Sequence, residues 1–457
     1  MDILEAAPPF NLASFKNLLS NAGHFLALFN SPGVQDLIRR ANREYCYWDK
    51  FKYLPMPEGL NPEQAWVMLK IARRSGMKPL PIRDKGGTQF QYWQPDEVLY
   101  LLHQIDLDAS GQLLIDEPGI DSSSKETYII SSLMEEAIAS SQLEGAATTR
   151  RIAKEMLKSG RKPSNNAEQM ILNNYITICE IQDLIGEKLS IKMLTHIHSL
   201  LTGNTLEDHR AVGRFRREDE DIAVVDRSDG QVLHITPEAG LLEERMQVFC
   251  NYANNDTEPE FIHPVIKAIV LHFWLAYDHP FVDGNGRTAR AVFYWYLLSR
   301  KYWLVKYLAI SKTILRAPSH YKKAFMYSEN DENDLTYFIM YNLKAIRISI
   351  LEVSKYLAQR QKEISELGRH IREIPDLHYR QYSLLQHALK HPTARYTFKT
   401  HINTHGISYQ TARNDIFSLN KLNLLERVPM KGAFAFTPSA QLLDKIKHYS
   451  RPRSSSA

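Results

Sequence analysis

The sequence predicts a mainly helical protein with a few short β-hairpins. Its two most apolar segments, residues 264–275 and 291–298, have helical length and are bounded by polar residues. A third segment, residues 128–143, repeats apolar side chains three and four positions apart, as one face of a helix requires. Strand-like runs are short and come in pairs around turn residues, so we expect hairpins and no large sheet.

The composition is that of an ordinary globular protein. Of 457 residues, 44% are hydrophobic and 24% charged, and the formal net charge of +4 is too small to indicate a nucleic-acid partner by itself. The three cysteines, Cys46, Cys179 and Cys250, are widely spaced and odd in number, which favours a reducing compartment over a disulfide framework. No run has the length of a membrane span, and the first residues lack the basic start of a signal peptide. We expect a cytoplasmic protein without membrane contact.

Residues 1–125 are expected to form a helical module. Three helices are predicted in it, over residues 34–45, 63–74 and 96–105. A turn is expected at residues 84–87, where two glycines follow Asp and Lys. The aromatic and charged stretch 47–53 is interpreted as part of a small core with a solvated rim. The alternative is a binding face, since aromatic rings attract lysine side chains.

A second domain is expected over residues 126–370, beginning with the helix at 128–143. Gly145 favours the left-handed backbone found after helix ends, so Glu144 lies in the last turn. Its carboxylate opposes the helix dipole there, and a nearby cation would relieve the conflict. Further helices are predicted over residues 167–185, 190–201 and 333–345, followed by a long polar helix through Glu366.

Two features between these helices concern binding. His196 and His198 are two positions apart, which does not place them on one helix face, so we interpret them as packing or surface residues and not as metal ligands. Residues 222–235 contain two β-branched runs around an Asp-Gly turn and predict a hairpin. The free edge of a hairpin can pair with an extended segment of a target protein.

The two apolar segments are joined by the stretch His279-Pro-Phe-Val-Asp-Gly-Asn-Gly-Arg-Thr-Ala-Arg290. A helix begins inside it, so its backbone N–H groups and its dipole favour an anion. Gly284 and Gly286 let an anion approach the backbone closely. Arg287 and Arg290 are three positions apart, share one helix face and can grip further phosphate oxygens.

Two more residues of this stretch suggest a reaction. Asp283 offers a hard oxygen ligand to Mg²⁺, which commonly accompanies nucleotide phosphates. His279 can accept a proton near neutral pH. The stretch therefore predicts a site that holds a nucleotide di- or triphosphate and deprotonates an incoming nucleophile. The alternative is a structural glycine-rich turn between two core helices.

Residues 371–457 are expected to form a separate domain. Three helices are predicted over residues 379–389, 397–404 and 408–419, followed by strands at 424–428 and 433–436. This order is that of a winged helix. Within residues 408–420, the side chains of Gln410, Arg413 and Asn414 would face a DNA groove. A winged helix used for dimerisation or protein docking is the alternative.

The stretch 279–290 resembles the Fic family, whose signature is His-x-Phe-x-(Asp/Glu)-Gly-Asn-Gly-Arg-x-x-Arg, and it matches that signature without departure. The resemblance implies a helical Fic domain with a β-hairpin flap, flanked by an N-terminal module and a C-terminal winged helix. It implies a nucleotidyltransferase that moves AMP from ATP to a Ser, Thr or Tyr hydroxyl of a protein and releases pyrophosphate. The hairpin 222–235 corresponds to the flap, which registers the target hydroxyl over the active site.

The resemblance also implies a role for each residue of the stretch. His279 would deprotonate the target hydroxyl, and Asp283 would hold Mg²⁺ against the α- and β-phosphates. ATP would be bound by Gly284, Asn285, Gly286, Arg287 and Arg290. The first three act mainly through backbone N–H groups, Arg287 at the β-phosphate and Arg290 at the γ-phosphate.

Ser140, Glu144 and Gly145 match the pattern (Ser/Thr)-x-x-x-Glu-Gly, which resembles the inhibitory helix of the same family. The resemblance implies that Glu144 pairs with Arg290 and keeps it from the γ-phosphate, so that ATP cannot settle with its α-phosphate in line. We therefore expect a weakly active resting state.

Several alternatives stay open at this point. Members of the family also remove AMP from proteins with this glutamate, or transfer phosphate, UMP or phosphocholine; the intact Asp283-Gly-Asn-Gly argues against the phosphate-transferring branch. A winged-helix DNA-binding regulator with a nucleotide-sensing Fic domain is the alternative from another class. The target protein, self-modification and homodimer formation are left open.

Overall fold

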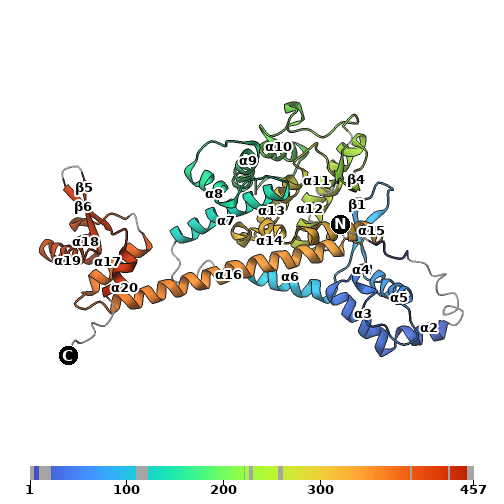
Figure 1. The fold of residues 1–457 in the computed structure, drawn as a ribbon, viewed down its shortest axis with the longest axis horizontal. Helices are drawn as coiled ribbons and strands as arrows, with labels where there is room; N and C mark the ends of the chain where they lie inside the picture. Colours follow the sequence, from blue (N-terminus) through green and yellow to red (C-terminus); the bar gives the residue numbers. More distant parts are fainter. Residues whose placement is uncertain are drawn as a thin grey trace. The chain divides into compact units, whose positions relative to one another are not determined.

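The computed structural model describes residues 5–9, 22–109, 122–220, 222–225, 230–255, 261–391, 394–430 and 433–449. These residues are mostly helical, and their strands form three separate two-stranded antiparallel sheets (Figure 1). The predicted mainly helical class is confirmed. The chain divides into two compact units: residues 1–112 with 128–352, and residues 113–127 with 353–457. No helix among the described residues is long and apolar enough to cross a membrane.

The first unit opens with short helices and a hairpin: α2 (Ala22–Phe29), α3 (Pro32–Glu44), α4 (Trp48–Phe51), α5 (Pro62–Arg74), β1 (Lys78–Arg83), β2 (Gln89–Tyr92) and α6 (Asp96–Ala109). Helix α5 begins at a capping box, in which Asn61 and Gln64 each accept the other's backbone N–H. The aromatic stretch 47–53 is core, as interpreted, because Tyr47, Trp48 and Phe51 are buried against Trp66.

The β1–β2 hairpin was not among the expected elements, although its turn at residues 84–87 was. Asp84 Oδ1 accepts the backbone N–H groups of Gly86 and Thr88, at 2.8 Å each, and so fixes the turn. Pro79 and Pro81 concealed strand β1, because proline cannot donate to a sheet ladder and normally argues against a strand. An edge strand such as β1 tolerates them.

The central part of the first unit contains the two apolar helices, α12 (Pro264–Asp278) and α13 (Asn285–Ser299), which pack side by side. Nearly every side chain of both helices is buried, since other elements surround them. Among these elements, α9 (Asn166–Glu180) and α10 (Ile191–Thr202) contact α13, and α11 (Leu242–Asn254) contacts α12. The same unit also contains α7 (Ser122–Leu143), α8 (Arg150–Ser159), α14 (Ile310–Leu315) and α15 (Pro318–Asn330). Helix α9 ends earlier than the predicted residue 185, because i→i−3 turn bonds follow it.

The predicted hairpin 222–235 is present as β3 (Ala223–Val225) and β4 (Val232–Ile235). Ala223 pairs with Ile235 in the antiparallel register. Residues 226–229 of the predicted turn lie outside the described residues. We call residues 222–225 and 230–235 the flap.

Helix α16 (Thr336–Arg372) is one continuous helix, where two were expected over residues 333–345 and through Glu366. No proline interrupts residues 336–372, so the change from an apolar to a polar sequence does not break the backbone hydrogen bonding.

The second unit contains α17 (Tyr379–Lys390), α18 (Phe398–His405), α19 (Tyr409–Lys421), β5 (Leu425–Met430), β6 (Ala433–Pro438) and α20 (Leu442–Tyr449). The predicted order of three helices and a hairpin is thus present, and α20 was not expected. Its core includes Leu385, Ile416, Leu419 and Phe436.

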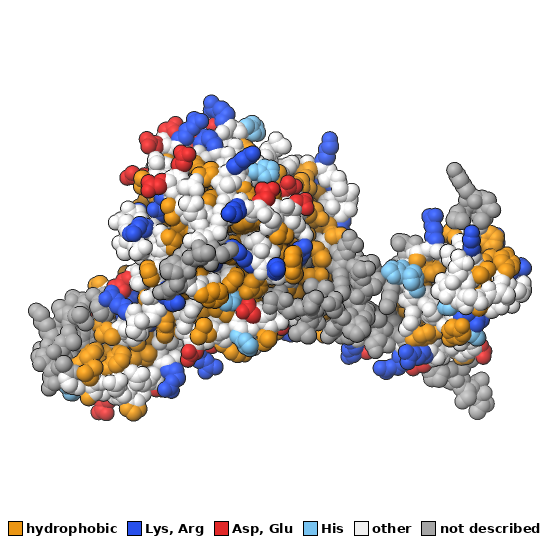
Figure 2. Space-filling view, turned by 180° about the vertical axis from the view of Figure 1, so that it is seen from behind, with side chains coloured by type: hydrophobic (Ala, Val, Ile, Leu, Met, Phe, Trp, Pro, Cys, Tyr) orange, Lys and Arg blue, Asp and Glu red, His pale blue; other side chains and the backbone are white. Residues whose placement is uncertain are grey.

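Acidic and basic side chains are interspersed over the face of the molecule drawn in Figure 2, in keeping with the small net charge.

Candidate active site

The loop between α12 and α13 begins at His279, which has φ 47° and ψ 55°. This left-handed backbone is uncommon outside glycine and must be held by its surroundings. Arg216 holds it: its Nε donates to the carbonyl of His279 at 2.9 Å, and its backbone N–H donates to Pro280 O at 2.8 Å. Arg216 is buried and also donates to Pro237 O. Sequence reasoning missed this residue.

The imidazole of His279 is oriented as a base. Its Nδ1 lies 3.2 Å from Ala276 O. A carbonyl oxygen only accepts hydrogen bonds, so Nδ1 carries the proton and Nε2 carries the lone pair. Burial lowers the pKa of His279 to about 4, so the ring is neutral at pH 7. A neutral ring with a bare Nε2 is ready to accept a proton.

Asn285 closes the loop with its side chain. Its Oδ1 accepts the N–H of Phe281 at 2.9 Å, and its Nδ2 donates to Phe281 O at 2.8 Å. The side chain is buried, 2% exposed. The amide is therefore engaged with the loop itself, which leaves the backbone of this residue for contact with a phosphate.

The glycines allow close packing at the first turn of α13. Gly284 has φ 79°, and a Cβ there would lie 2.7 Å from Thr202 Cγ2. A Cβ on Gly286 would lie 2.1 Å from Glu144 Oε1. A carboxylate therefore rests directly on the helix N-terminus, where the exposed N–H groups and the dipole favour an anion.

Glu144 belongs to the turn that follows α7, and it pairs with Arg290. Nη2 of Arg290 lies 2.7 Å from Glu144 Oε1. The same guanidinium donates to both oxygens of Ser140, from Nε to Oγ at 2.8 Å and from Nη2 to the carbonyl at 2.9 Å. The chain turns away immediately afterwards at Gly145, which has φ 92°. The structure thus brings Ser140, Glu144 and Arg290 together.

The surroundings of Arg290 keep it charged. Its side chain is 4% exposed. Burial alone disfavours the charge, but the neighbouring carboxylates, Glu144 first among them, outweigh burial and raise the pKa of Arg290 above its usual value. A buried guanidinium needs an anionic partner, and any ligand that replaces Glu144 must supply one.

A second ion pair at the first turn joins Asp283 and Arg287. Asp283 Oδ2 is 3.3 Å from Nη2 of Arg287, and the Asp283 side chain is 48% exposed. Arg287 is fully buried, and its Nη1 donates to Leu201 O at 2.9 Å. Arg287 therefore ties the loop to the end of α10 in addition to facing Asp283.

Asp283 fits a magnesium ion that arrives with a nucleotide. Mg²⁺ is usually held by one or two carboxylates together with substrate phosphates. Asp283 provides one exposed carboxylate beside the anion-favouring turn. The described residues contain no cluster of three or more His, Cys, Asp or Glu side chains that would hold a metal without such a partner.

His198 is a further residue of the site, and its role was missed. Its ring stacks on Phe281 with centroids 3.8 Å apart and planes 4° apart. The N–H of Gly213 donates to Nδ1 at 3.1 Å, so Nε2 carries the proton and donates to Asp283 O at 3.0 Å. The interpretation as a packing residue was correct, but no pattern in the sequence indicates that the packing partner is the loop, 85 positions away.

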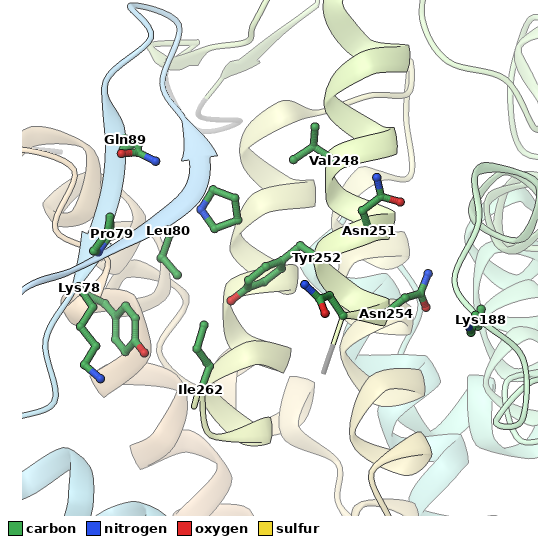
Figure 3. Close-up of a pocket in the computed structure, with 13 residues that line it drawn as sticks. Lys78, Pro79, Leu80, Gln89, Lys188, Val248, Asn251, Tyr252, Asn254 and Ile262 are labelled. Atoms are coloured by element: carbon green, nitrogen blue, oxygen red, sulfur yellow. The ribbon is translucent and has the colours of Figure 1, made fainter. Parts of the chain in front are cut away.

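A cavity also lies elsewhere in the first unit. It has a volume of about 790 Å³ and lies between β1 and α11 (Figure 3). Its lining includes Lys78, Leu80, Asn251, Tyr252 and Lys188. None of the lining residues belongs to the stretch 279–290, so the cavity is separate from the candidate active site.

Comparison with known proteins finds a family model that matches the same stretch. The model of the Fic/DOC family matches residues 188–297, which include α10, the flap, α12 and most of α13. The protein adenylyltransferase Fic of Nematostella vectensis is 35% identical over 107 residues, 23% of this chain and 22% of that protein. The protein of the same name from Drosophila willistoni is 32% identical over 116 residues, 25% of this chain and 20% of that protein. The chain thus aligns with about a fifth of the length of these relatives.

Solved structures give a distant likeness. A Fic family protein from Desulfovibrio desulfuricans G20 covers 75% of this chain and 94% of its own, with a TM-score of 0.49 and 19% identity. Residues 134–508 of Fic-1 from C. elegans cover 76% of this chain and 97% of their own, with a TM-score of 0.47 and 17% identity.

Proposed function

We propose that the protein, whose residues 188–297 match the model of the Fic/DOC family, transfers AMP from ATP to a Ser, Thr or Tyr hydroxyl of a target protein. One observation carries the proposal most directly. A carboxylate rests on the first turn of α13, in contact with Arg290, at the position that a phosphate would take. The proposed base, His279 with its unprotonated Nε2, lies at the other end of the same loop.

In the proposed reaction, the target hydroxyl oxygen attacks the α-phosphorus of ATP. Nε2 of His279 accepts the hydroxyl proton as the new P–O bond forms. The bond between the α-phosphorus and the bridging oxygen breaks, and pyrophosphate leaves with the electron pair. The neutral, buried ring of His279 supports this role, because it needs no prior deprotonation at pH 7.

The phosphates would lie on the first turn of α13. Backbone N–H groups of Gly284, Asn285 and Gly286 would donate to them, with Arg287 at the β-phosphate and Arg290 at the γ-phosphate. Positioning and charge stabilisation supply most of the catalysis in reactions of this type. Loss of one such donor typically lowers the rate about a hundredfold.

Asp283 would hold a magnesium ion that accompanies the nucleotide. Bound there, Mg²⁺ would neutralise charge on the α- and β-phosphates. His198 and Arg287 support this role of Asp283, because one holds its backbone carbonyl and the other faces its carboxylate.

We further propose that Glu144 inhibits the enzyme. Its carboxylate occupies the space over Gly286 and engages the amino group of Arg290 that would otherwise face the γ-phosphate. ATP must displace it, so the resting protein would be weakly active. The same carboxylate near the phosphates is compatible with the alternative, an enzyme that mainly removes AMP from proteins.

The test is autoradiography with α-labelled ATP and Mg²⁺ on three proteins: wild type, Glu144→Gly, and Glu144→Gly with His279→Ala. We expect strong protein labelling in the second, including self-modification, and none in the third. Labelling by γ-labelled ATP or by another nucleotide instead would retain the Fic domain and reject AMP transfer. Pre-labelled protein that loses its AMP faster with wild type than with Glu144→Gly would favour the removal reaction.

A second candidate function concerns the second unit. Gln410, Arg413 and Asn414 are exposed on α19, while Ala412, Ile416 and Leu419 of the same helix are buried. An exposed polar face on the third helix of this arrangement supports DNA binding through residues 408–420. On this reading, the Fic domain would sense nucleotides and the second unit would contact DNA.

A further inference from the structure

His234 fastens the flap to two helices. It lies on β4, its side chain is 9% exposed, and each ring nitrogen has a partner. Nε2 lies 2.8 Å from Tyr277 O, at the end of α12, and Nδ1 lies 2.8 Å from Glu329 Oε2, on α15. Its ring also packs on that of Tyr277, with centroids 4.4 Å apart. Tyr277 precedes His279 by two residues, so this contact joins the flap to the segment that carries the proposed base.

The two contacts require one proton more than a neutral imidazole and an ionised carboxylate possess. Tyr277 O only accepts, so Nε2 must carry a proton. At 2.8 Å, the contact between Nδ1 and Glu329 Oε2 also needs a hydrogen between two atoms that otherwise both accept. Whichever atom carries it, the His234–Glu329 pair holds a shared proton while the flap is fastened.

Other charged groups near His234 include residues of α12 and α11, and Asp84 and Lys85 of the β1–β2 turn lie near Tyr277. A positive charge on the His234 ring lowers the pKa of both Asp278 and His279, at the end of α12. The Asp278 carboxylate favours a protonated His234 ring. Arg245 of α11 pairs with Asp278, however, and so offsets much of that attraction. Glu329 is therefore the carboxylate that shares a proton with His234. Histidine is the side chain whose charge most readily changes between pH 5 and 8.

We propose that His234 is a positioning residue: it holds the flap beside His279 while it shares a proton with Glu329, and loss of that proton frees the flap. The inference rests on the proposed function, in which the flap presents the target. The flap leaves Val225, Val232 and Ile235 about half exposed, so it has an apolar surface for an extended target segment. A fastened flap sets that segment at a fixed distance from the base, and a free flap does not.

Hydrogen–deuterium exchange of the backbone amides of residues 230–235 tests this without ATP or a target. Protection factors, corrected for intrinsic exchange, would be compared at pH 6 and pH 8 in the full-length protein. In wild type we expect protection to fall about tenfold at pH 8, the effect of losing one charge-assisted hydrogen bond. His234→Ala should show the low value at both pH values.

Glu329→Gln makes the test specific. The amide of glutamine donates to an unprotonated Nδ1, so the contact no longer needs the shared proton. We expect protection in this variant to be nearly the same at pH 6 and pH 8. The matched control is His320→Gln, an exposed histidine on the same helix as Glu329, which should behave as wild type.

Equal wild-type protection at the two pH values, or an unchanged pH dependence in Glu329→Gln, would overturn the inference. Thermal melting of each variant identifies a general loss of structure, which would lower protection throughout the unit and not only in the flap. Absence of nucleotide labelling would reject the proposed function alone. Exchange results bear on the flap whether or not the protein transfers AMP.

Discussion

One oxygen of Glu144 lies 2.7 Å from Nη2 of Arg290 and 2.1 Å from the point where a Cβ on Gly286 would stand. The two distances show that the Glu144 carboxylate takes the position for which a nucleotide phosphate would compete. An anion already sits where the helix N-terminus and the arginine favour an anion, and it belongs to the protein itself. A nucleotide phosphate reaches the same groups only if the glutamate leaves.

Glu144→Gln should bind ATP about tenfold more tightly, because a neutral amide neither repels phosphate nor holds Arg290 as strongly as a carboxylate. Isothermal titration calorimetry with Mg²⁺ and ATP measures the change. Glu187→Gln, an exposed residue outside the site, is the control and should bind as wild type. Identical affinities in all three proteins would show that Glu144 does not compete with the nucleotide.

Gly284→Ala should destabilise the fold more than alanine at another left-handed glycine. Both Gly284 (φ 79°) and Gly160 (φ 67°) force an L-residue into a strained backbone, at a cost of about 1–2 kcal/mol. Only at Gly284 would the new Cβ also meet a neighbour, Thr202 Cγ2 at 2.7 Å, whereas no atom lies within 4 Å at Gly160. Urea unfolding of the two variants gives the difference, and equal losses would mean that Thr202 moves aside freely.

The sequence alone was sufficient to predict those parts of the site that depend on residues close together in the chain. The two apolar segments gave α12 and α13, and the glycines and arginines between them defined the loop. The expected pairing of Glu144 with Arg290 came from a resemblance, because nothing local connects two residues 146 positions apart.

The missing parts are long-range packing contacts. Arg216 holds the carbonyl of His279 across 63 positions, and His198 holds Asp283 O across 85. A single histidine within an amphipathic helix has no spacing that reveals such a partner. The β1–β2 hairpin was missed for another reason: its two prolines suppress the usual strand signal, and only its place at a sheet edge makes them acceptable.

Stability should fall as the pH drops below about 6.5, because buried histidines, His272 and His198 in addition to His279, resist protonation. Burial lowers the pKa of His272 to about 3 and that of His198 to about 4. Below the ordinary histidine value, the unfolded chain binds protons that the folded protein does not, so folding loses about 1.4 kcal/mol per pH unit for each residue. This contribution is complete above pH 6.5 and is lost as the pH approaches the folded values.

His272→Gln tests the assignment, since the glutamine amide can still form a hydrogen bond with Tyr321 OH, which lies 2.8 Å from His272 Nε2. The free energy of unfolding, measured in urea at pH 7 and pH 5, should depend on pH less steeply in this variant. The decrease in slope should correspond to about one fewer proton taken up on unfolding. His196→Gln removes an exposed histidine and should leave the slope as it is. An unchanged slope in His272→Gln would assign the pH dependence to other groups.

Arg413→Ala should abolish binding of genomic DNA fragments in a gel shift, if the second unit contacts DNA through α19. Arg413 is exposed beside Gln410 and Asn414, and a guanidinium at that position is suited to a guanine edge or a phosphate. Lys421→Ala is the matched control: it removes one positive charge from the exposed far end of the same helix and should weaken binding only slightly. Equal weakening by both substitutions would indicate non-specific charge attraction. A wild-type protein that shifts no fragment at low salt would discard DNA binding and leave docking or dimerisation as the role of this unit.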